Sequence, residues 1–142
     1  MIRIPSGLAA RIRQLAEEAC PEECCGLLVG RPDEGGSVQV TRLVPSPNIL
    51  NERATDRFEV DPQIRFDLMR QIRGTDESLI GHYHSHPNHP AQPSDYDLER
   101  AMEPDLIWLI VSLTDGKADD IKAHRLEGDG FMEEALEITQ TD

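Results

Sequence analysis

Lysine is nearly absent from this chain of 142 residues, whose 14 basic side chains comprise 12 arginines and only Lys117 and Lys122. With 27 acidic side chains, the formal net charge is −13. Non-specific affinity for nucleic acid comes from lysine and arginine neutralising phosphates, so this negative charge argues against a nucleic-acid partner. We interpret the acidic, lysine-poor composition as an adaptation to a salty interior, where counter-ions screen self-repulsion.

The sequence also lacks long apolar runs, and only 4% of its residues are aromatic. No stretch approaches the roughly 18 apolar residues of a membrane span, and residues 1–20 contain no apolar core of the kind that a secretory signal needs. We therefore expect no membrane contact and a cytoplasmic location. Because domains cluster near ~100–150 residues, we assign residues 1–142 to a single domain.

Cysteine is scarce and confined to one place, since Cys20, Cys24 and Cys25 are close neighbours in the sequence. Cysteines so closely spaced cannot form a framework of disulfides across the chain. We expect Cys24 and Cys25 to be small buried strand residues. The alternative is a cysteine hydrolase, in which one of their thiolates is the nucleophile and a histidine assists it.

Hydrophobic periodicity and turn residues predict an alternation of helices and strands. In chain order we expect a helix over 6–20, strands over 24–30 and 37–44, a helix over 62–73, a strand over 79–84, a helix over 94–102, and strands over 106–111 and 119–126. Residues 45–57 are expected to form a long surface loop, and residues 131–138 fit a helix or a strand. This order favours an α/β (α+β) fold, with a mixed sheet flanked by helices.

The predicted ends of these elements rest on capping and turn residues. Ser6 is expected to cap the first helix, and Asp61-Pro62 to cap and begin the second. Turns are expected at Gly35-Gly36 and Asp115-Gly116. The strand over 106–111 is apolar on both faces, which is typical of a strand covered on each side.

Four of the five histidines, His82, His84, His86 and His89, fall within eight residues. On an extended chain, residues two apart point to the same side about 6.6 Å apart. Two such imidazoles can converge on one ion with Zn–N distances of ~2.0–2.1 Å. From spacing alone, the pairs 82/84 and 84/86 compete as metal ligands, and sets containing 82 with 86 or 89 remain open.

A third ligand can come from Asp97, because Ser94 and Asp97 lie three apart on a predicted helix and share a face. Two histidines and one carboxylate leave one tetrahedral position open, as in catalytic zinc sites. A hydrolase also needs a base to take a proton from water, and Glu23, directly before the strand over 24–30, is the candidate. Taken alone, Ser94-x-x-Asp97 is better explained as a capped helix N-terminus, and Glu23, next to Glu22, is equally a solvated charge.

Together these residues resemble the JAMM (MPN-plus, Mov34/PAD-1) zinc metallopeptidases. The matching elements are Glu23 followed by Cys24-Cys25-Gly26-Leu27-Leu28-Val29-Gly30, then His84-Ser85-His86-Pro87, and then Ser94-x-x-Asp97. Phe58-x-x-Asp61-Pro62 and the chain length resemble small stand-alone bacterial members in particular. The resemblance implies the MPN/JAB (cytidine-deaminase-like) fold, with a curved mixed sheet.

The resemblance also implies roles for single residues. His84, His86 and Asp97 would hold one Zn²⁺ per chain, Glu23 would be the general acid/base, and Ser94 would stabilise the tetrahedral intermediate. His82 then becomes a neighbour of the site, whereas His89 is expected in a loop near the cleft and His124 on a strand surface.

The implied substrate is the C-terminal tail of a ubiquitin-like or sulfur-carrier protein, cleaved at a peptide or isopeptide bond after its glycines. The main alternative is a non-catalytic scaffold or binding module, since members of the wider MPN family lose the metal ligands. A homodimer through an exposed strand is a further expectation.

Overall fold

The computed structural model of the chain describes residues 1–33, 35–50, 57–100, 103 and 105–140. Among these residues, no helix is long and apolar enough to cross a membrane. The elements in chain order are β1 (Ile2–Pro5), α1 (Ser6–Ala19), β2 (Cys25–Pro32), β3 (Val38–Ser46), α2 (Pro62–Ile72), β4 (Ser78–Pro87), α3 (Asp95–Arg100), β5 (Ile107–Thr114), β6 (Lys117–Glu127), β7 (Gly130–Glu134) and β8 (Leu136–Thr139).

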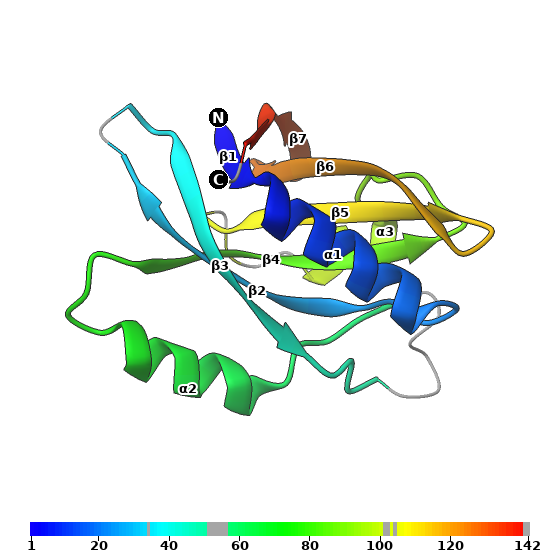
Figure 1. The fold of residues 1–142 in the computed structure, drawn as a ribbon, viewed down its shortest axis with the longest axis horizontal. Coiled ribbons are helices and arrows are strands. Elements are labelled where there is room, and N and C mark those ends of the chain that lie inside the picture. The colour runs from blue at the N-terminus through cyan, green and yellow to red at the C-terminus, as the bar shows by residue number, and fades with distance from the viewer. Residues whose placement is uncertain (34, 51–56, 101–102, 104, 141–142) are drawn as a thin grey trace.

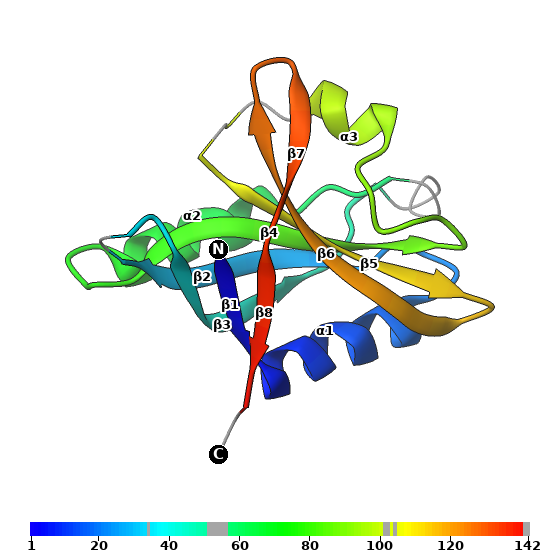
Figure 2. The same ribbon diagram turned by 90° about the horizontal axis from the view of Figure 1, so that it is seen from above.

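All these strands belong to one mixed sheet in the order β7-β6-β5-β4-β2-β3-β1-β8. Strand β1 pairs in parallel with β3 and β8, and β4 pairs in parallel with β5, whereas the other neighbours are antiparallel. Because β8 follows β7 directly, one continuous stretch of chain supplies both edges of the sheet (Figure 2). The sheet is therefore strongly curved and nearly closed.

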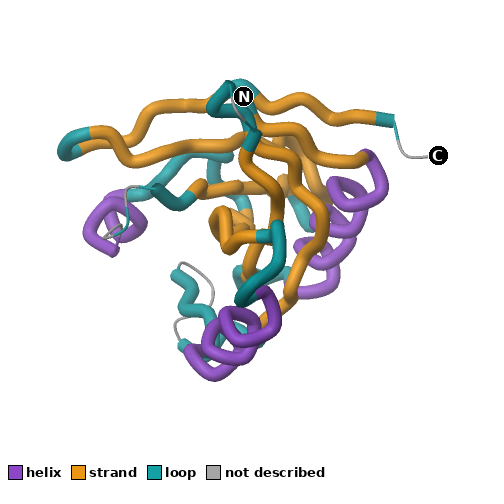
Figure 3. The backbone as a smooth tube through the Cα atoms, turned by 90° about the vertical axis from the view of Figure 1, so that its left-hand side faces the viewer, coloured by secondary structure: helices purple, strands orange, loops and turns teal. Residues whose placement is uncertain are grey.

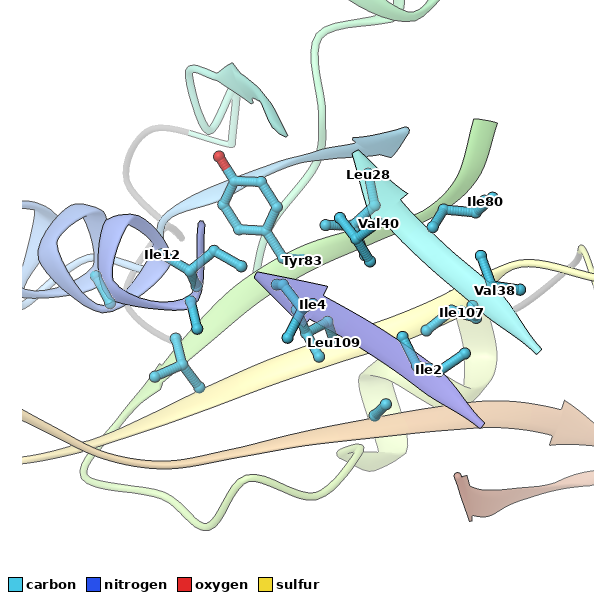
Figure 4. Packing of buried hydrophobic residues seen from close by; sticks show 14 of the residues in the cluster. Ile2, Ile4, Ile12, Leu28, Val38, Val40, Ile80, Tyr83, Ile107 and Leu109 are labelled. Carbon is cyan, nitrogen blue, oxygen red and sulfur yellow. The ribbon is translucent and has the colours of Figure 1, made fainter. Parts of the chain in front are cut away.

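The main core lies between the sheet and α1 (Figure 1). The buried face of α1 carries Ala9, Ile12 and Ala16, at helical spacing. Figure 4 shows Ile12 beside Ile4 of β1 and side chains from β2, β3, β4 and β5. Removing this apolar surface from water is the main source of stability for the sheet and α1.

The opposite face of the sheet is covered by α2 and, further along, by α3 and its preceding loop (Figures 2 and 3). Leu68 and Ile72 of α2 pack on Leu27 and Val29 of β2. Next to this cluster, Cys25, Phe58 and Trp108 form a smaller apolar group, with Phe131 at its margin. The histidines of β4 lie on this second face.

Most predicted elements are present, and their ends differ for local reasons. Asp61 caps α2 by accepting a hydrogen bond from the Gln63 amide at 2.9 Å, as expected. The expected cap at Ser6 is wrong, because Pro5 occupies the N-cap position and Ser6 is the first helical residue. Asp115 and Gly116 both have positive φ (50° and 81°), which suits the tight turn between β5 and β6.

Three regions add to the sequence expectation or differ from it. The strand β1, whose four residues directly precede α1, was not predicted. Residues 131–138, which fitted a helix or a strand, belong to β7 and β8. In the loop expected over 45–57, β3 continues to Ser46 and Asn48 forms an isolated bridge with Val60, while residues 51–56 lie outside the described part of the chain.

Candidate metal centre and active site

Pairing between β2 and β4 brings Glu23 to the histidines. In this antiparallel pair Cys25 lies opposite His84. One residue further, the Ser85 amide donates to the Cys24 carbonyl at 3.2 Å and the Cys24 amide donates to Ser85 Oγ at 2.8 Å. The side chain of Glu23 is only 3% exposed, and the potential ligand atoms of Glu23, His84 and His86 all lie within 4.8 Å of one another.

Three donor atoms converge at the end of β4. His84 Nε2 lies 3.0 Å from His86 Nε2 and 3.3 Å from Asp97 Oδ2, and His86 Nε2 lies 3.2 Å from the same oxygen. Ligand bonds of ~2.0–2.1 Å at tetrahedral angles place donor atoms about 3.3 Å apart. The three atoms therefore form a triangle of the size that one zinc ion would require, and all three side chains are buried.

The orientation of each histidine is set by its neighbours. His86 Nδ1 lies 2.9 Å from the Pro90 carbonyl, which can only accept, so Nδ1 carries the proton and Nε2 is left with a lone pair. The ring of His84 stacks on Phe58, with centroids 4.1 Å apart and planes inclined by 17°. Both Nε2 atoms are thus aimed at the same point.

Asp97 is held by the start of α3. Its Oδ2 accepts a hydrogen bond from the Ser94 amide at 2.9 Å, and its own amide donates to Ser94 Oγ at 3.1 Å. This reciprocal pair is a capping arrangement, so the helix-cap interpretation of Ser94-x-x-Asp97 applies. The same pair orients the Asp97 carboxylate toward the histidines. The Ser94 hydroxyl uses an oxygen lone pair in this contact and keeps its own proton to donate.

The pKa shifts favour the metal-binding form of His84 and Asp97 and oppose it at His86. Burial lowers the pKa of His84 despite the nearby Asp97 carboxylate. Burial also opposes charge on Asp97, but the two histidines and the Ser94 amide outweigh it and lower the pKa of the carboxyl. At His86 the hydrogen bonds to Asp97 and Pro90 outweigh burial and raise the pKa. Asp97 is therefore ionised and His84 neutral, as metal ligands must be.

The remaining histidines take other positions. The ring of His82 packs edge-on against Trp108, with centroids 4.2 Å apart, and burial lowers its pKa to about 3. His89 lines the cleft in front of the site, as expected for a loop residue near it. The expectation that His124 lies on a strand surface is wrong, because His124 is 3% exposed and its Nε2 lies 2.9 Å from the Ala91 carbonyl.

The cysteines lie next to the site without the properties of nucleophiles. Burial raises the pKa of Cys24 to about 11 and that of Cys25 to about 12. A nucleophilic cysteine needs the opposite shift, because the thiolate is the reactive form. Cys25 is buried, as expected, and Cys24 is half-buried. The cysteine-hydrolase alternative is therefore not supported.

A cleft of about 480 Å³ opens beside the candidate ligand His86. The candidate base and residues of the neighbouring loops complete its lining, which consists of Glu23, Arg57, His86, His89, Pro90, Gln92, Pro93, Ser94 and Asp95. A second cavity of about 580 Å³ is lined largely by apolar and aromatic side chains, among them Phe58, Leu106 and Trp108.

The fold and this donor set define a JAB-type domain with a group of buried side chains that could hold a metal ion. Residues 5–127 match the family described as prokaryotic homologs of the JAB domain. The chain therefore belongs to the prokaryotic JAB family.

Named relatives and a solved structure agree with this assignment. The chain is 34% identical to a desampylase of Haloferax volcanii, over 83% of this chain and 79% of that protein. It is 30% identical to a CysO-cysteine peptidase of Mycobacterium tuberculosis, over 84% and 79% of the two chains. A solution structure of a protein from Desulfitobacterium hafniense superposes with a TM-score of 0.86, at 32% identity, covering 99% of this chain and 94% of that one.

Proposed function

We propose that this chain is a zinc-dependent peptidase that hydrolyses the peptide or isopeptide bond after the C-terminal glycines of a ubiquitin-like or sulfur-carrier protein. The observation that carries the proposal is the triangle of donor atoms from His84, His86 and Asp97, with the buried Glu23 beside it. The names of the relatives, a desampylase and a CysO-cysteine peptidase, support the same substrate class.

In this proposal His84, His86 and Asp97 hold one zinc ion. When bound, zinc would lower the pKa of water toward ~7 and polarise the carbonyl of the scissile bond. The Pro90 carbonyl keeps Nδ1 of His86 protonated and Nε2 available, and the Ser94 amide holds Asp97 Oδ2 in place. Preorganised ligands of this kind avoid the cost of rearranging the site when the ion binds.

Glu23 would move the protons of the reaction. Its carboxylate, buried beside the histidines, accepts a proton from the attacking water and then returns it to the nitrogen of the leaving amine. The hydroxyl of Ser94, which lines the same cleft, donates a hydrogen bond to the carbonyl oxygen as negative charge develops on it. The leaving amine must therefore lie within reach of Glu23, in the cleft that Glu23 lines.

The burial of the candidate ligands favours a substrate that is small near the ion. His84, His86 and Asp97 are each at most 4% exposed, and His86 lines a cleft of about 480 Å³. Glycines satisfy that condition, because their backbone can approach the ion without a side chain in the way. We further propose that the protein acts in the cytoplasm, where ubiquitin-like carriers would be its substrates.

The test is incubation of the zinc-loaded protein with ubiquitin-like carriers extended beyond Gly-Gly, with cleavage located by mass spectrometry. We expect a single cut after the last glycine, abolished by a metal chelator and insensitive to a thiol alkylator. The Glu23→Gln variant serves as the matched control, because it should bind zinc and not cleave. Binding of carriers without cleavage by the zinc-loaded wild type would support the scaffold alternative instead.

A further inference from the structure

The loop over 88–93 connects the two halves of the proposed metal site. It follows β4, which carries His84 and His86, and it leads into Ser94 and α3, which carries Asp97. Its Pro90 carbonyl also accepts the hydrogen bond from His86 Nδ1. A displacement of this loop would therefore disturb a histidine ligand and the carboxylate ligand together.

One end of the loop is fastened to the turn between β5 and β6. The Asn88 amide donates to the Leu113 carbonyl at 2.7 Å, and Asn88 Oδ1 accepts from the Asp115 amide at 3.0 Å. Asn88 has a φ of 57°, a left-handed conformation that asparagine tolerates better than most residues. These contacts fix where the loop begins and leave its middle to be held by other groups.

The middle of the loop is held by His124 of β6. In the sheet His124 lies opposite Trp108 of β5, which is itself in register with His82 of β4, so the His124 side chain is on the site face. Its Nε2 lies 2.9 Å from the carbonyl oxygen of Ala91, and both residues are only 3% exposed. Because a carbonyl can only accept, His124 Nε2 is the donor.

Two successive carbonyls of the loop are thus bound by two different histidines: Pro90 by His86 and Ala91 by His124. We propose that His124 is a positioning residue of the metal centre, which holds the Ala91 peptide and thereby keeps the Pro90 carbonyl aimed at His86 Nδ1. This inference rests on the proposed function, in which His86 is a ligand of the ion. In this inference, the hydrogen bonds that support the ligand His86 continue through the loop to β6.

The physical reason is the choice between the two tautomers of His86. Only the tautomer with the proton on Nδ1 presents a lone pair at Nε2, and the Pro90 carbonyl selects it. If the Ala91 peptide can rotate, the adjoining Pro90 carbonyl loses its direction and that selection weakens. Groups that orient a metal-bound histidine typically contribute 10–100-fold to metal affinity, and a more distant group is expected at the lower end.

The test compares His124→Phe, which keeps a ring but has no donor, with His124→Gln, which can place an amide N–H near the former Nε2. The zinc Kd is measured by competition with a chromophoric chelator, and the tautomer of His86 by ¹⁵N NMR of the zinc-free protein. We expect His124→Phe to raise the Kd about tenfold and to give a mixture of His86 tautomers. His124→Gln should retain the wild-type Kd and tautomer.

A matched control is Thr41→Val, which removes a hydroxyl that donates to the Glu77 carboxylate at 2.5 Å, away from the site. It should leave the zinc Kd and the His86 tautomer unchanged, whatever it does to the melting temperature. If Thr41→Val lost as much zinc affinity as His124→Phe, nonspecific destabilisation of the fold would explain both results. That outcome would overturn the inference.

Two further outcomes separate this inference from the proposed function. Wild-type zinc Kd and a single His86 tautomer in His124→Phe would overturn the inference alone. A wild type that binds no zinc would overturn the proposed function, and the inference with it. If His124→Phe does not fold, His124→Asn replaces it, because the shorter amide side chain cannot reach the Ala91 carbonyl. Equal zinc Kd values for His124→Asn and His124→Gln would then overturn the inference.

Discussion

The two faces of β4 have different roles, although their residues alternate along one strand: one face presents candidate metal ligands and the other packs in the core. On one face, His84 and His86 point at Asp97. On the other face, Tyr83 is fully buried against Gly26 of β2 and belongs to the core under α1. Because successive strand residues point in opposite directions, the four consecutive residues 83–86 serve both the core and the site.

This difference separates stability from chemistry. Substitutions on the core face should lower the free energy of unfolding and leave the donor atoms where they are, since the backbone of β4 is fixed by β2 and β5. Substitutions on the site face should change zinc binding or turnover in a protein that still folds.

The largest effect is expected for Glu23→Gln on the site face. The amide keeps the size of the side chain but cannot take a proton, so kcat should fall about 10²–10⁴-fold. Zinc content, measured by elemental analysis, should remain at the wild-type level. A variant that turns over carrier substrate near the wild-type rate would remove Glu23 from the mechanism.

The next largest effect concerns the core face. A Cβ at residue 26 would lie 2.4 Å from the ring of Tyr83, so Gly26→Ala must displace a buried aromatic side chain. Such overpacking typically costs about 1–3 kcal/mol, which urea denaturation would measure. The folded fraction should bind zinc with unchanged Kd. A selective loss of zinc affinity would show that the two faces are coupled.

Acid should release zinc from the site while the core stays folded, because only neutral imidazole binds zinc. Burial of His86 is outweighed by its hydrogen bonds to Asp97 and Pro90, which raise its pKa. Protons therefore compete with zinc for His86 already at pH values above the ordinary histidine pKa of about 6.5. Below the raised pKa of His86, the zinc Kd should rise up to tenfold for each pH unit. Competition titrations between mildly alkaline and acidic pH test this. A Kd independent of pH would contradict ligation by imidazole.

The smallest effect is expected for Tyr83→Phe. Among the described residues the buried Tyr83 hydroxyl has no hydrogen-bond partner, so its removal should change the free energy of unfolding by less than about 1 kcal/mol, or increase it. Neither kcat nor the zinc Kd should move. A marked loss of activity would instead connect the core face of β4 to the chemistry.

Much of the fold follows from local patterns in the sequence. The apolar spacing in α1, the Asp61-Pro62 start of α2 and the Asp115-Gly116 turn are each encoded within a few residues. Strand β1 is too short for alternation to show, and β7 and β8 are mostly half-exposed, so only pairing with distant strands defines them. Pairing across the sheet is a tertiary property that periodicity does not contain.

The same limit applies to the site. Histidine spacing predicted a metal pair but left 82/84 and 84/86 in competition, and resemblance to the JAMM family selected His84 and His86. The same resemblance supported Glu23, which reaches the histidines only through pairing of β2 with β4. Nothing in the pattern indicated that Phe58 stacks on His84 or that His124 is buried against the loop. Such contacts join residues far apart in the sequence, and a lone histidine in a strand carries no signal for them.

The proposed function requires that one ion is shared by two side chains of β4 and one of α3. Anomalous diffraction at the zinc edge from crystals of the zinc-loaded protein tests it directly. We expect one peak per chain, within ~2.0–2.1 Å of His84 Nε2, His86 Nε2 and an Asp97 carboxylate oxygen. A peak centred on His82 or His89, or none at these residues in protein loaded with stoichiometric zinc, would contradict the account.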